Sequence, residues 1–239
     1  MKKQKVTIKS ILGMICFVML LLSVFFAVIK LFTAPESPAD ALPHERLKSD
    51  YLLMVLQCLL GIAVLFLPAI IEKRFRIDIP NFMEGLYFVF LYCAIYLGEV
   101  RNFYFVIPHW DLILHTFSGV MLGALGFSII DIMNDSRRVK ISLSPAFIAL
   151  FAFCFALAAG CIWEIYEYIM DGVFHMNMQK FMLENGTQLI GRLAVADTME
   201  DIIVDTLGAL FTCVIGFFSL RRKHRRENTS DKQQEVCTP

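Results

Sequence analysis

The chain has 239 residues, of which 57% are hydrophobic and 18% charged, and its 22 Lys and Arg balance 22 Asp and Glu. Soluble domains carry about 25% charged and about 45–50% apolar residues, so this composition is typical of a membrane protein and excludes a disordered, coiled-coil or collagen-like chain. The zero net charge argues against nucleic-acid binding, which requires a basic surface.

Six apolar stretches are long enough to cross a membrane, which takes about 20 helical residues. The first exceeds the ~7–15 apolar residues of a signal peptide, so we expect it to be retained. We therefore predict an all-α, polytopic membrane helix bundle with a cytoplasmic N-terminus at 1–10, a transmembrane domain at 11–220 and a basic, disordered cytoplasmic tail at 221–239. The predicted spans are about 11–32, 51–71, 82–97, 111–130, 145–168 and 197–220.

The distribution of Lys and Arg predicts the orientation. Cytoplasmic loops are enriched in these residues, and placing both termini in the cytoplasm puts sixteen of the 22 on that side and six on the other. The sixteen are Lys2, Lys3, Lys5, Lys9, Lys73, Arg74, Arg76, Arg137, Arg138, Lys140, Arg221, Arg222, Lys223, Arg225, Arg226 and Lys232. We expect the basic tail to contact anionic headgroups of membrane lipids.

Acidic residues and one histidine gather at one end of the last three predicted spans. Ionisable side chains within spans are costly and indicate a functional site. The predicted orientation places this end on the extracytoplasmic side. The residues are Asp111 and His115 in the fourth span, Glu164, Glu167 and Asp171 in the fifth, and Asp197, Glu200, Asp201 and Asp205 in the sixth.

Counting along the helices predicts the depth of these residues. Fifteen uncharged residues separate His115 from Asp131, and fifteen separate Asp205 from Arg221. At ~1.5 Å per residue, His115 and Asp205 both lie roughly 23 Å from the inner edge, whereas the same count places Glu164 nearer the outer surface. Gly119 and Gly123 continue the His115 face, and Gly208 continues the Asp205 face, so we expect the two helices to pack closely there.

Several buried carboxylates need protons, bases or a cation to compensate their charge. The bases expected nearby are Arg101, Arg192, His109 and His115. A divalent cation is the third solution; carboxylates favour Mg, Ca or Mn, and a histidine permits Zn or Fe. The metal ligands predicted are Asp111, His115, Glu164, Glu167, Asp201 and Asp205, with Asp171 and Asp197 supporting them.

The acidic residues also have plainer interpretations. Asp111, Asp171, Asp197 and Glu200 are near enough to water to be ordinary interface residues. The more deeply placed residues, His115, Glu164, Asp201 and Asp205, would then form a structural hydrogen-bond network.

Three segments of the chain resemble the YjdF-like (DUF2238) family of bacterial inner-membrane proteins. They are 110–119 (WDLILHTFSG), 163–168 (WEIYEY) and 197–209 (DTMEDIIVDTLGA), together with Gly186-Thr187-Gln188. The resemblance covers about residues 80–220, and this chain departs from the pattern by an extra stretch at 189–196. A looser similarity extends to VanZ-like proteins. The resemblance implies a multi-pass bacterial plasma-membrane protein with the same acidic-histidine set, and it implies no reaction.

Three functions remain open at this point. The first is a metal-assisted enzyme acting at the outer leaflet on a lipid or envelope substrate. The second is an ion- or proton-coupled transporter, although residues 116–130 and 206–220 contain no charge that could line a path. The third is a non-catalytic envelope factor whose polar network fixes helix packing.

Overall fold

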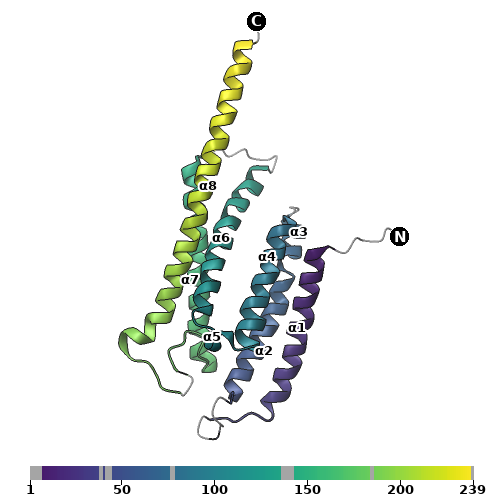
Figure 1. Ribbon diagram of the computed structural model, residues 1–239, viewed down its shortest axis with the longest axis vertical. Helices are drawn as coiled ribbons and strands as arrows, with labels where there is room; N and C mark the ends of the chain where they lie inside the picture. Colours follow the sequence, from purple (N-terminus) through teal and green to yellow (C-terminus); the bar gives the residue numbers. More distant parts are fainter. Residues whose placement is uncertain are drawn as a thin grey trace, which may run out of the picture. The chain divides into compact units, whose positions relative to one another are not determined.

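The computed structural model describes residues 7–37, 40, 45–75, 79–135, 143–183 and 186–237 (Figure 1). The regular elements of these ranges are helices, apart from one isolated bridge between Met182 and Gln188. They are α1 (Ile8–Leu31), α2 (Lys48–Leu65), α3 (Leu67–Phe75), α4 (Asn81–Leu91), the π-helix η1 (Tyr92–Val100), α5 (Phe103–Val106), α6 (Trp110–Asp135), α7 (Pro145–Phe174), the 3-10 helix η2 (Gly191–Val195) and α8 (Ala196–Cys237).

Six helical segments among the described residues are long and apolar enough to cross a membrane, when α2 is joined to α3 and α4 to η1. The predicted all-α, polytopic class is therefore confirmed. The α8 backbone continues past the predicted sixth span to Cys237, through a stretch rich in Arg, Lys, Glu and Gln, which favour helix. Seven of the basic residues used to predict the orientation lie outside the described residues: Lys2, Lys3, Lys5, Arg76, Arg137, Arg138 and Lys140.

The chain divides into two compact units. The first comprises Met1–Leu114 and Ile165–Thr198, and the second comprises His115–Glu164 and Met199–Pro239. In the first unit, side chains of α1, α2, α4 and η1 form an apolar core around the fully buried Leu20 and Met54. Gly61 permits the close packing, because a Cβ there would lie 2.4 Å from the Ile95 side chain.

A proline explains why the second span consists of two helices. Pro68 has no N–H to donate to the carbonyl of Val64, four residues earlier. The Tyr87 hydroxyl of α4 donates to that carbonyl instead, at 2.7 Å. The break between α2 and α3 is thus compensated by a hydrogen bond from a neighbouring helix.

Glu84, near the start of the third predicted span, is buried in α4. Its carboxylate accepts a hydrogen bond from the Lys9 ammonium of α1 at 2.5 Å. This ion pair compensates the charge of a carboxylate within an apolar helix.

The second unit contains α6 from His115 onward, α7 up to Glu164 and α8 from Met199 onward. These helices run side by side (Figure 1) and meet at glycines. A Cβ at Gly126 of α6 would lie 2.6 Å from the Ala152 backbone of α7, and a Cβ at Gly160 of α7 would lie 2.7 Å from the Asp205 carboxylate of α8. The helices approach so closely because these positions lack side chains.

Candidate functional site

The imidazole of His115 lies among three carboxylates in the second unit. His115 is 7% exposed, and Glu164, Asp201 and Asp205 are 4%, 1% and 3% exposed. The four residues come from all three helices of the unit, and all lie within apolar segments. The predicted convergence of these four side chains is therefore present in the structure.

The closest carboxylate to His115 is Asp205. The His115 Nδ1 and the Asp205 Oδ2 are 3.1 Å apart, within hydrogen-bond distance. The Ser118 hydroxyl, one turn further along α6, donates to the Asp205 Oδ1 at 2.6 Å. The equal depth that residue counting predicts for His115 and Asp205 is confirmed by this contact.

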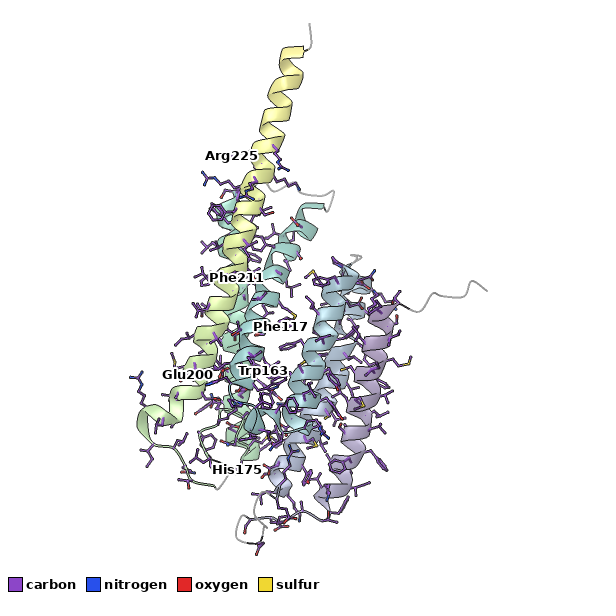
Figure 2. The ribbon with its side chains drawn as sticks, viewed as in Figure 1. Phe117, Trp163, His175, Glu200, Phe211 and Arg225 are labelled. Carbon is purple, nitrogen blue, oxygen red and sulfur yellow. The ribbon has the colours of Figure 1, made fainter. Side chains whose placement is uncertain are left out.

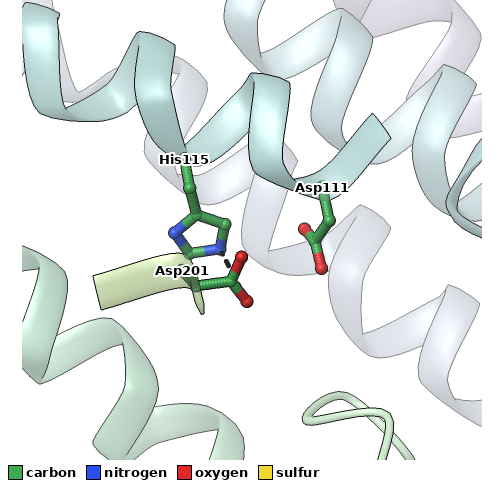
Figure 3. A group of neighbouring side chains, drawn as sticks. All are labelled: Asp111, His115 and Asp201. Atoms are coloured by element: carbon green, nitrogen blue, oxygen red, sulfur yellow. Dashed lines mark ion pairs between the residues drawn. The ribbon is translucent and has the colours of Figure 1, made fainter. Parts of the chain in front are cut away.

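The other ring nitrogen faces the two remaining carboxylates. His115 Nε2 is 3.8 Å from Asp201 Oδ2 and 4.0 Å from Glu164 Oε1. Figure 3 shows the ion pair of His115 with Asp201, and Asp111 one turn before His115 on α6. One ligand atom of His115 and one of Asp201 are close enough to share a metal ion.

Counting from the cytoplasmic edge places Glu164 nearer the outer surface than His115, unless the fifth helix is tilted or begins late. In the structure the Glu164 Oε1 lies 4.0 Å from His115 Nε2, so the two side chains meet at one level of the second unit. The α7 helix has 30 residues, which span roughly 45 Å at ~1.5 Å per residue, more than the ~30 Å of a hydrocarbon core. A helix of this length can extend beyond the membrane or tilt within it, which is the condition under which the count allows Glu164 to reach His115.

The predicted packing of α6 against α8 is confirmed beside the four polar residues. A Cβ at Gly119 would lie 2.3 Å from the Asp205 carbonyl oxygen, and a Cβ at Gly208 would lie 2.4 Å from the Thr116 carbonyl oxygen. Gly123 faces Thr212 and Ala209 in the same interface. The two backbones touch here, so little space remains between α6 and α8 below His115.

Two more of the predicted site residues belong to an ion-pair group in the first unit. Lys180, in the segment between α7 and α8, donates to Asp111 of α6 and lies 3.3 Å from Asp197 of α8. Its ammonium also lies 5.5 Å from the Tyr104 ring centroid, a cation–π distance. Asp111 and Asp197 thus neutralise one lysine.

The Asp171 carboxylate holds the backbone of the segment that follows α7. It accepts hydrogen bonds from the backbone N–H groups of Met178 at 2.7 Å and Gln179 at 3.0 Å. These bonds position Lys180, which has a left-handed backbone with φ 46°. Glu167, also in the first unit, is buried on α7.

Sequence reasoning missed three residues around these groups. The base beside Asp111 and Asp197 is Lys180, whereas the bases expected, Arg101, His109 and Arg192, are exposed. No spacing rule predicts Lys180, because it lies 69 residues from Asp111. The other two missed residues, Ser118 and Gly160, could have been found from helical spacing. Ser118 lies three residues from His115 and Gly160 lies four residues before Glu164, so each shares a helix face with a predicted site residue.

These observations define a class: a polytopic α-helical membrane protein with a buried acidic and histidine cluster in its last three spanning helices. Within that class, the chain belongs to the family described as predicted membrane protein (DUF2238), whose model matches residues 14–222. The match includes the first two spans, which the motifs at 80–220 do not cover.

A similar protein is an uncharacterised protein of Thermotoga maritima, 27% identical over 143 residues. The match covers 60% of this chain and 66% of that protein. No solved structure matches the chain.

Proposed function

We propose that this protein is a multi-pass protein of the bacterial inner membrane that binds a divalent metal ion through His115, Glu164 and Asp201, and that the metal assists an enzymatic reaction on a lipid or envelope substrate. The observation that supports this most directly is a buried imidazole facing two carboxylates across 3.8 and 4.0 Å. Asp111 and Glu167, predicted as further ligands, lie in the first unit, and the proposal does not depend on them.

Charge balance supports a cation. With a neutral His115, the three carboxylates carry three negative charges among residues that are at most 7% exposed. Burying such charges without compensation costs several kcal/mol per ion. A divalent cation would cancel two of the three charges and would lie within reach of the oxygens that approach His115 Nε2.

The distances also support a shared ion. Two ligand atoms bound to one metal at about 2.1 Å each are separated by at most about 4.2 Å. The distances from His115 Nε2 to Asp201 and Glu164 fall just below that limit, and small side-chain movements would bring the three atoms to a tetrahedral or octahedral arrangement. Mixed nitrogen and carboxylate ligands suit Zn, Fe or Mn.

The surroundings favour an enzyme over a transporter. A transported ion needs a polar path, yet residues 116–130 and 206–220 contain no charge, and α6 contacts α8 through backbone atoms at Gly119 and Gly208. A metal held at one membrane face can act as a Lewis acid on a carbonyl or phosphoryl oxygen. Such groups lie where lipid headgroups join their chains.

The metal proposal predicts a clear difference between neighbouring residues of α8. Purified wild-type protein is expected to contain about one divalent ion per chain by elemental mass spectrometry, and Asp201→Asn and His115→Ala are expected to lose it because each removes a ligand. Glu200→Gln is the matched control, since Glu200 is exposed next to Asp201 (Figure 2), and it is expected to keep the ion.

Two results would contradict metal binding. One is a wild-type protein that stays metal-free after incubation with Zn, Mn and Fe(II) and shows no rise in Tm with any of them, although a bound ion stabilises a fold by mass action. The other is an Asp201→Asn variant that retains as much metal as Glu200→Gln.

The enzymatic part of the proposal needs a separate measurement. Lipid extracts of cells producing wild-type protein are expected to differ by mass spectrometry, in one lipid or lipid-linked class, from extracts of cells producing Asp201→Asn at equal abundance. If the lipid extracts are identical although the wild-type protein contains its metal, the protein does not act as an enzyme on these lipids. The metal or the polar network would then have a structural role.

The orientation predicted from the Lys and Arg distribution can be tested by labelling. In a cysteine-free protein, Arg101→Cys and Arg192→Cys are expected to react with a membrane-impermeant thiol reagent in intact cells. Arg74→Cys and Arg226→Cys are expected to react only after the membrane is opened, because basic residues remain in the cytoplasm. Labelling of Arg74→Cys in intact cells would reverse the orientation and place the cluster on the cytoplasmic side.

A further inference from the structure

We propose that α8 binds one anionic phospholipid on a single face, at the end of its apolar segment. The headgroup phosphate is bound by Arg222, Lys223 and Arg226, and the acyl chains lie along the apolar residues that precede them. The sequence predicts only a general attraction between the basic tail and lipid headgroups, whereas the structure selects one face of the helix. The inference does not rest on the proposed metal site, from which the uncharged residues 206–220 separate these three basic residues.

The site is a surface hollow along α8 with a volume of about 720 Å³, within the range of about 300–1,000 Å³ for small-molecule sites. Its lining residues on α8 form two neighbouring rows with a spacing of four residues, which places them on one helix face. The rows are Val214, Phe218, Arg222 and Arg226, and Ile215, Ser219 and Lys223. Arg221 and Arg225 belong to a third row and do not line the hollow. Figure 2 labels Phe211 and Arg225, between which most of this face lies.

The three basic side chains of this face are available to a ligand. Arg222, Lys223 and Arg226 are exposed, and none of them forms an ion pair with another residue that the structure describes. Arg222 and Arg226 are one turn apart, about 6 Å along the helix axis at ~1.5 Å per residue. Arginine binds phosphate oxygens through two parallel N–H groups, and lysine adds a compact third charge. Together they suit the phosphate of a single headgroup.

The apolar part of the face indicates that this phosphate belongs to a lipid. Val214, Ile215 and Phe218 are 46%, 54% and 50% exposed, so their side chains point outward from the helix. Phe218 lies about 6 Å from Arg222 along the axis at ~1.5 Å per residue, and the headgroup region is about 5–8 Å thick on each side of the hydrocarbon core. The face therefore changes from apolar to basic over the distance that separates acyl chains from headgroups. A free phosphate compound has no group that would occupy the apolar half.

Ser219 supplies a hydroxyl between the apolar and the basic residues. Hydroxyls within helices often donate to the carbonyl four residues earlier, as those of Ser23, Ser128 and Thr206 do. Ser219 is exposed, and its hydroxyl makes no hydrogen bond to another described residue. Its proton is therefore available to a phosphate or ester oxygen in the hollow.

The test is native mass spectrometry of the purified, delipidated full-length chain in detergent, titrated with dioleoyl phosphatidylglycerol or dioleoyl phosphatidylcholine. The wild type is expected to bind one phosphatidylglycerol molecule per chain and to prefer it to phosphatidylcholine by about 10-fold or more. Arg222→Gln/Arg226→Gln is expected to weaken this binding roughly 30-fold, the effect of two basic residues that each attract anionic lipid. Arg221→Gln/Arg225→Gln removes the same charge outside the hollow and is expected to weaken binding by about 3-fold at most.

Three results would overturn the inference. Equal losses in the two double variants would mean that the whole tail attracts lipid without a site. Equal affinity for the two lipids would mean that charge does not select the occupant. Displacement of phosphatidylglycerol by glycerol phosphate at the same concentration, or by a short single-stranded DNA, would assign the basic residues to a free phosphate compound or to nucleic acid.

If Arg222→Gln/Arg226→Gln does not purify as a folded protein, two single variants decide. Lys223→Gln is expected to weaken phosphatidylglycerol binding about 5-fold, the effect of one basic residue. Arg221→Gln is expected to leave the binding nearly unchanged, because Arg221 does not line the hollow. Equal binding by these two variants would overturn the inference in the same way.

Discussion

Gly119→Leu is expected to destabilise the protein by about 3 kcal/mol or more, the upper end of the cost of overpacking. The first added carbon alone would lie 2.3 Å from the Asp205 carbonyl oxygen, and the neighbouring contacts are also backbone atoms, at 3.0 Å. Backbone cannot rotate away as a flexible side chain can, so α6 and α8 would have to separate. The measurement is the apparent Tm in detergent, followed by size-exclusion chromatography after heating.

Gly172→Ala is the matched control for this prediction. Gly172 lies in α7 and a Cβ there would meet nothing within 4 Å. Alanine favours helix over glycine by about 0.8–1.0 kcal/mol, so this variant is expected to keep or raise the Tm. A Gly119→Leu protein that melts with the wild type would show that α6 and α8 do not meet along this glycine face.

His115→Ala is expected to cost about 1–3 kcal/mol in metal-free protein, the range for leaving a buried polar group without its hydrogen-bond partner. It removes the ring nitrogen that lies 3.1 Å from Asp205 and leaves three carboxylates together in a region that is at most 4% exposed. In that background, Asp205→Ala is expected to cost less than it does in wild type, or to stabilise the fold, because it then removes a repulsive charge. Apparent Tm values of the two single variants and the double variant measure this coupling.

The expected coupling is at least about 0.5 kcal/mol, the lower end for residues in one hydrogen-bond network. Glu200→Ala replaces Asp205→Ala in the control cycle, because Glu200 is exposed on the same helix. Its effect is expected to be the same with and without His115. Additive behaviour of His115 and Asp205 would mean that their 3.1 Å contact contributes nothing specific to the fold.

The six spans could be predicted from the sequence because each is a local property. A helix in lipid satisfies its own backbone hydrogen bonds, so about 20 apolar residues suffice to indicate it. The start of α7 is equally local: Pro145 is its first residue and the Ser144 hydroxyl accepts the N–H of Phe147 at 3.2 Å. The division of the second span at Pro68 is visible in the sequence, whereas its compensation by Tyr87 depends on a neighbouring helix.

The core of the candidate site was also predictable, for a geometric reason. His115 and Gly119 share one face of α6, and Asp205 and Gly208 share one face of α8, so charge and small size at helical spacing indicate both the polar group and the close packing beside it. Residue counts from the nearest charges placed His115 and Asp205 at one depth, and their contact at 3.1 Å agrees.

What each side chain does within that group was decided only by the tertiary structure. The sequence assigned Asp111, Asp201 and Asp205 alike to a metal, because acidic residues on one face are equivalent in a count. In the folded chain, Asp111 pairs with Lys180, and Asp201 faces one ring nitrogen of His115. Asp205 lies within hydrogen-bond distance of the other ring nitrogen and accepts from the Ser118 hydroxyl. These differences depend on distances between helices far apart in sequence, which helix period and composition do not contain.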